Sequence, residues 1–164
     1  MSMLPEDPPR PQAATDFPPK GPNSLASTTE RGAARLIDLL IELIPVLIIF
    51  IVWALRSDPR VDEFPRWPLY VFVFGAVVYE TGLVSWRGQS LGKFLLGVRV
   101  ARLLDGSKPD SSWSAMRVLL PCAVLVVPVV GPGLYLFVYL WAVVTPMRRG
   151  VHDMAAGTVV VRAR

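Results

Sequence analysis

The sequence is poor in the side chains that most protein chemistry requires. Its 164 residues include one cysteine, Cys122, and one histidine, His152. A single cysteine cannot form an intrachain disulfide, and one cysteine with one histidine cannot complete a Cys/His zinc site. The glycine-rich phosphate-binding patterns of dinucleotide-binding and P-loop proteins are also missing. We therefore expect a protein that is not an enzyme, with no catalytic residues and no bound cofactor or metal.

Charge is missing over long stretches as well. Residues 118–144 form a run of 27 residues without one charged side chain. A run of about 18 or more apolar residues is typical of a membrane segment. Residues 36–55 and 69–85 are two further apolar segments, and about 20 helical residues cross the hydrocarbon core of a bilayer. The sequence predicts an all-α polytopic membrane protein with two transmembrane helices and a third hydrophobic region.

The third hydrophobic region is broken by Gly131-Pro132-Gly133, which is a strong turn signal. One helix over 118–144 would be about 40 Å long, too long for a simple span. Two interpretations remain open. One is a hairpin of helices at about 113–130 and 134–147, whose short second arm could be re-entrant, and the other is a single kinked helix.

The distribution of basic residues favours the hairpin. Counted from Lys20 onward, a hairpin places thirteen lysines and arginines on one side of the membrane and three on the other, against nine and seven for a single helix. Cytoplasmic loops carry the basic excess. We therefore predict a multi-pass protein of the cell (plasma or inner) membrane with both termini in the cytoplasm.

The N-terminal region has a different composition. Residues 1–30 hold seven of the sixteen prolines and lack an apolar period. Such a segment buries too little apolar surface to offset its ordering entropy. We predict a disordered tail over 1–30 and a membrane domain over 31–164.

Two short segments have strand-like composition. Val98-Arg99-Val100 alternates apolar and basic side chains, and residues 158–161 are all β-branched. They are predicted to pair as a small cytoplasmic sheet. The alternative is an amphipathic interfacial helix over 91–104, with its basic side chains toward phospholipid head groups.

Several ionisable residues lie in or beside the apolar segments. Arg35, Asp38 and Glu42 share one helix face, and Glu80 lies in the second segment. A carboxylate near the bilayer centre costs about 2.5–3.5 kcal/mol, so such groups normally find partners. In the hairpin topology Asp153 returns to the membrane face that carries Arg35. We predict an ion-paired clamp of Arg35, Asp38 and Asp153, with a proton or cation path through the carboxylates as the alternative.

The order and spacing of these residues resemble the RDD family of small membrane proteins over about residues 31–162. The name refers to one arginine and two aspartates, which map here to Arg35, Asp38 and Asp153. The resemblance implies a fold and a polar constellation, and it does not imply a substrate. Its other motif positions are Gly88, Gln89, Gly92, Lys93, Gly97, His152, Gly157 and Thr158.

These observations favour an accessory or structural component of a membrane complex. The alternative function is a small transporter of protons or cations, which would need several copies because one copy has few helices. The expected partners are the lipid bilayer, anionic lipid head groups, and further copies of the chain or another membrane subunit. Nucleic acid is not expected, because the positive-inside bias accounts for the basic residues.

Overall fold

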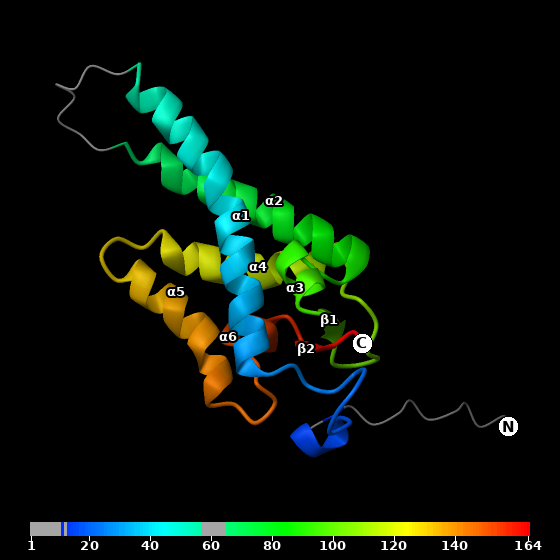
Figure 1. Cartoon of the computed structure of the whole chain (residues 1–164). Coiled ribbons are helices and arrows are strands. Elements are labelled where there is room, and N and C mark those ends of the chain that lie inside the picture. The colour runs from blue at the N-terminus through cyan, green and yellow to red at the C-terminus, as the bar shows by residue number, and fades with distance from the viewer. Residues whose placement is uncertain (1–10, 12, 57–64) are drawn as a thin grey trace, which may run out of the picture.

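The computed structural model describes residues 11, 13–56 and 65–164. Residues 1–10 and 12 of the predicted tail, and Arg60 of the loop after the first segment, lie outside the described residues. The described chain is mostly helical, with one small antiparallel sheet (Figure 1).

The first long helix, α1, runs from Thr28 to Ala54 and therefore begins well before the predicted residue 36. A capping box starts it. Ser27 Oγ accepts a hydrogen bond from the Glu30 N–H at 3.1 Å, and the Glu30 carboxylate accepts one from the Ser27 N–H at 2.7 Å. Arg31 therefore lies inside the helix, one turn before Arg35.

The second long helix, α2, spans Trp67–Arg87 and packs antiparallel to α1 (Figure 1). A short helix, α3 (Leu91–Leu95), then returns to pack on α1. Both α1 and α2 are long and apolar enough to cross a membrane. In the apolar 18-residue stretch of each helix, only 17% is buried inside the fold.

The third hydrophobic region is a helical hairpin. Its arms are α4 (Ser111–Leu125) and α5 (Gly131–Leu140), and the 3-10 helix η2 (Trp141–Val143) extends the second arm. The two arms pack on each other, and α4 also packs on α2. The first arm ends before the predicted residue 130, because Pro128 and a left-handed Val129 (φ 65°) interrupt the helical backbone. The predicted turn residues Gly131-Pro132-Gly133 instead form the first turn of α5, and the second arm ends before the predicted residue 147.

The predicted β-pair is confirmed. Strand β1 (Val98–Arg102) pairs antiparallel with β2 (Thr158–Arg162), and Val100 lies opposite Val160. The interfacial-helix alternative is wrong over residues 98–102, although α3 occupies 91–95.

A segment of the predicted tail is folded against this sheet. Leu25 forms an antiparallel bridge with Val161, and the Ala26 N–H donates to the Val160 carbonyl at 3.1 Å. Ala26 is buried with Ala34 and Val160. Strand β1 covers one edge of β2 and leaves the other edge free to bind this segment. Composition alone predicts disorder here because it does not reveal that free edge.

The last helix, α6 (Val151–Ala155), connects the hairpin to β2. The start of α1, α3, α6 and the sheet gather at one end of the molecule (Figure 1). The paired helices α1 and α2 project away from that end, so the fold separates a compact, charged end from an apolar one.

Candidate functional site

Asp38 lies at the centre of the first group of buried charged side chains, and it is 0% exposed. Its Oδ1 accepts hydrogen bonds from the Tyr79 hydroxyl at 2.9 Å and from the Gly92 N–H at 2.8 Å. Its Oδ2 accepts a hydrogen bond from Ser90 Oγ at 2.5 Å and lies 3.7 Å from the Lys93 ammonium. Asp38 therefore joins α1 to both α2 and α3.

The glycine-rich turn between α2 and α3 explains why α3 packs so closely on α1. Gly88 ends α2 in the left-handed conformation (φ 73°) and turns the chain back. Gln89 fixes the returning segment by donating from Nε2 to the Val98 carbonyl at 2.9 Å. Gly92 permits the close approach, because a Cβ there would overlap the Ala34 carbonyl oxygen.

Arg35 and Lys93 connect the remaining carboxylates of this group. Lys93 Nζ lies 2.8 Å from Glu80 Oε1. Arg35 Nη1 lies 3.4 Å from Glu80 Oε2 and 3.0 Å from Glu42 Oε1. Arg35 Nη2 donates to the Tyr135 hydroxyl at 2.6 Å. Arg35 thus links α1, α2 and α5 through one guanidinium.

Asp153 organises a second group at the start of α6. Arg31 Nη2 donates to its Oδ2, and Arg117 Nη2 lies 3.0 Å from its Oδ1. The Gly150 N–H also donates to Oδ2, at 3.2 Å. Burial alone would raise the pKa of Asp153, but Arg117 and Arg31 hold it well below its usual range. The carboxylate is therefore charged, and it ties α6 to α1 and α4.

His152 lies beside Asp153 as a neutral ring. Its Nε2 is 3.4 Å from Asp153 Oδ1, and its ring centroid is 4.5 Å from that of Tyr139. Burial lowers the pKa of His152 to about 4, and the positive charges of Arg117 and Arg31 act in the same direction against the opposing Asp153. The ring is therefore uncharged at neutral pH.

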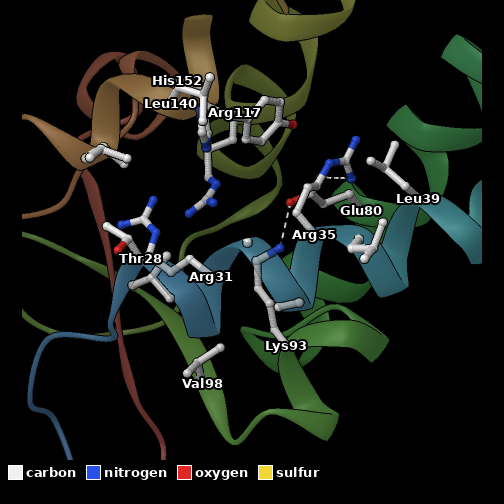
Figure 2. A pocket seen from close by; sticks show the side chains of 17 residues that line it. Thr28, Arg31, Arg35, Leu39, Glu80, Lys93, Val98, Arg117, Leu140 and His152 are labelled. Atoms are coloured by element: carbon white, nitrogen blue, oxygen red, sulfur yellow. Dashed lines mark hydrogen bonds and ion pairs between the residues drawn. The ribbon is translucent and has the colours of Figure 1, made fainter. Parts of the chain in front are cut away.

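A cavity of about 290 Å³ opens between α1 and the end of the hairpin. Arg31, Lys93 and Arg117 line it from α1, α3 and α4. The charged ends of Arg31 and Arg117 lie near each other, and the Lys93 ammonium points toward Glu80 (Figure 2). Glu80 and His152 also line the cavity, together with apolar side chains of α1 and η2.

The two groups together contain four carboxylates and four cations. The carboxylates are Asp38, Glu42, Glu80 and Asp153, and the cations are Arg31, Arg35, Lys93 and Arg117. Each carboxylate forms an ion pair with at least one of the cations. Within the described ranges, no group of three or more His, Cys, Asp or Glu side chains is placed to hold a metal ion. The arrangement can hold helices in register and bind a small charged group.

Comparison with known protein families decides the classification. The model of the RDD family matches residues 25–157, from the segment beside β2 to the end of α6. The chain belongs to the RDD family. Searches of curated proteins and of solved structures find no match. The RDD match and the two apolar helices point to a membrane protein, and neither defines an activity.

The RDD arginine and aspartates do not form one clamp. The predicted pairing of Arg35 with Asp153 is wrong, because Asp153 pairs with Arg31 and Arg117 instead. Arg31 and Arg35 are one helical turn apart on α1, and Asp153 reaches the first of them. Arg35 is engaged with the deeper carboxylates of Glu42 and Glu80.

The other RDD motif positions have structural roles. Gly97 (φ 66°) and Gly157 (φ 56°) adopt left-handed turns before β1 and β2. Thr158 Oγ1 accepts a hydrogen bond from Arg117 Nη1 at 3.3 Å. Lys93 lies 2.8 Å from the Glu80 carboxylate and so belongs to the charged network.

Sequence reasoning missed Arg31, Arg117 and Ser90 as members of the network. The capping box at Ser27 would have placed Arg31 inside α1, since Ser-x-x-Glu is a helix-start signal. Ser90 lies within the Gly88–Lys93 motif, but its contact with Asp38 depends on how α3 packs. Arg117 has no local signal, because its role depends on how α4 packs.

Proposed function

We propose that this RDD protein is a multi-pass membrane protein in which α1 and α2 cross the bilayer. Large apolar side chains cover the outer faces of both helices and of the hairpin. Phe74 on α2 is 72% exposed and Leu36 on α1 is 60% exposed. A lipid environment would cover these side chains, whereas extended apolar patches of this kind are rare on soluble monomers.

The orientation follows from charge. The end that carries the sheet and α6 contains the basic excess, and the first and last described segments both lie at that end. Placing it in the cytoplasm satisfies the positive-inside rule. We place the protein in the plasma or inner membrane with both termini inside.

The hairpin fits a re-entrant segment better than two full spans. The arm α4 is about 22 Å long and Gly131–Val143 is about 20 Å long, against a hydrocarbon core of about 30 Å. At its tip, the N–H groups of Val127, Val130 and Gly131 donate to the carbonyls of Val124, Pro128 and Val127.

The charged network supports a structural or accessory role. The single observation that carries this role is that all four buried carboxylates are ion-paired within the fold. A network of this kind specifies how helices pack, and it leaves the apolar surface for contact with lipid or another subunit. We therefore infer an accessory component of a membrane complex.

Purification of the full chain from its native membrane in mild detergent tests this role. The expected result is a second membrane protein in fixed stoichiometry that remains bound after a second affinity step. A homo-oligomer free of other proteins would contradict the accessory role.

One observation favours the alternative role, an oligomeric proton or cation transporter. Glu42 Oε2 is buried and has no hydrogen-bond partner in the described part of the chain. Pro45, one turn further along α1, cannot donate to the Ile41 carbonyl. These oxygens could accept a proton or a cation. In liposomes, a flux present in the wild type and lost in Glu42→Gln would establish this role, and equal flux would exclude Glu42 from it.

A further inference from the structure

The cavity beside α1 has a cationic floor. Arg31, Lys93 and Arg117 converge there from three helices (Figure 2). Of the four buried carboxylates, only Glu80 lines the cavity. An anion in the cavity would therefore face the positive ends of several ion pairs, and guanidinium groups are suited to bind phosphate and carboxylate oxygens.

The floor also carries unused hydrogen-bonding capacity. Arg117 Nε and His152 Nδ1 are buried and have no hydrogen-bond partner among the described residues. Both side chains line the cavity, and both are only 3% exposed. Buried polar atoms nearly always have a partner, and both of these nitrogens belong to side chains that line the cavity.

The mouth of the cavity is apolar. Leu36 of α1, Leu140 at the end of α5 and Val143 of η2 line it. They are 60%, 60% and 64% exposed, so they face outward on the surface that we assign to lipid. The opening therefore leads from the lipid-facing side of the fold to the cations of the floor.

We propose that this cavity binds the anionic head group of an amphiphile whose hydrocarbon chain leaves through the apolar mouth into the bilayer. The volume of 290 Å³ lies at the lower limit of ligand pockets, which measure about 300–1,000 Å³. It suits a phosphate or carboxylate with its first carbons, and the remaining chain stays in the lipid. The inference rests on the proposed membrane placement of α1 and the hairpin.

The test uses the full chain in uncharged detergent, titrated with dioleoyl phosphatidic acid, dioleoyl phosphatidylcholine or inorganic phosphate. Binding is followed by the thermal shift and by native mass spectrometry. We expect phosphatidic acid to bind about tenfold or more tightly than phosphatidylcholine. Inorganic phosphate at the same concentration should produce no shift, because it lacks the chain that occupies the mouth.

A matched pair of glycine variants locates the binding. Gly32 of α1 lines the cavity and has open space at its Cβ position, so Gly32→Leu fills the mouth without a clash. Gly82 of α2 has the same open space away from the cavity. Gly32→Leu should weaken binding about tenfold or more, and Gly82→Leu should change it less than about twofold.

Equal binding of the two lipids, or unchanged binding by Gly32→Leu, would overturn the proposal. Protection by inorganic phosphate alone would replace it with a site for free anions. A sodium carbonate wash of the membranes is a separate test. Release of the chain by the wash would contradict the membrane placement, whereas retention without a lipid preference would contradict the binding site alone.

Discussion

Asp153 is the carboxylate that the C-terminal segment contributes to the buried network. Arginines from two helices meet it, Arg31 from α1 and Arg117 from α4. Removing one partner of a buried pair leaves uncompensated charge and costs more than the intact pair contributes. At the residue scale, the position of α6 and β2 therefore depends on this carboxylate.

Asp153→Asn should lower the free energy of unfolding by about 3–5 kcal/mol, because two buried guanidiniums lose their counter-charge. It should also expose β2 to proteolysis. The control is Asp105→Asn in the exposed turn after β1, which should leave both measurements nearly unchanged. Identical thermal unfolding of the two variants in detergent would show that Asp153 does not dock the segment.

His152 should make stability depend on pH. Its pKa is about 4 in the fold against an ordinary value of 6.5, so the unfolded chain binds more protons between these values. Stability should be highest above pH 6.5 and should fall as the pH decreases toward 4. His152→Gln should show a shallower fall over this window. Parallel melting curves for wild type and variant would contradict the buried, neutral ring.

Gly92 should tolerate no side chain, because a Cβ there meets the Ala34 carbonyl oxygen and the Asp38 carboxylate. Gly92→Ala should cost about 1–3 kcal/mol through displacement of α3. Gly82→Ala, in open space on α2, should instead stabilise the protein by about 0.5–1 kcal/mol. Urea unfolding of the two variants would compare them, and a stabilised Gly92→Ala would refute the close packing.

At the scale of elements, the hairpin and the sheet depend on each other. The hairpin returns the chain to the end where it started, so that β2 can lie between β1 and residues 23–26. A single helix over the same region would carry β2 to the opposite end. The antiparallel register of Val100 with Val160 therefore supports the hairpin independently of charge.

The tip of the hairpin offers a test of the re-entrant topology. Val129 is 97% exposed in the fold, so only lipid would protect it. In membranes, Val129→Cys should resist a water-soluble maleimide from both sides, and it should react after detergent solubilisation. Labelling from the side of Arg56 would mean that the hairpin crosses the bilayer fully.

The elements are largely predictable from the sequence, and the pairing of charges is not. Apolar length predicts α1 and α2, Gly131-Pro132-Gly133 predicts the hairpin, and β-branched residues predict β2. The partner of Asp153 depends on which turn of α1 the start of α6 faces, and that is set by the packing of α6 on α4 and α5. Since Arg31 and Arg35 share one helix face, spacing alone cannot choose between them.

At the scale of the whole molecule, polarity is divided between two ends. The end with the sheet contains most of the charged residues, and the buried network lies just inside it. Beyond Glu42, the outer face of α1 is exposed and apolar for the rest of its length. In the proposed membrane placement, this division gives one aqueous end, a lipid-facing body and a charged network at the boundary between them.

The accessibility of two engineered cysteines tests this division most directly. Arg56 at the end of α1 and Asp105 after β1 are both exposed, and Cys122→Ala removes the native thiol. In sealed inside-out and right-side-out vesicles, we expect Asp105→Cys to react only from the cytoplasmic side and Arg56→Cys only from the other. Reaction of both cysteines from the same side would show that α1 does not cross the membrane.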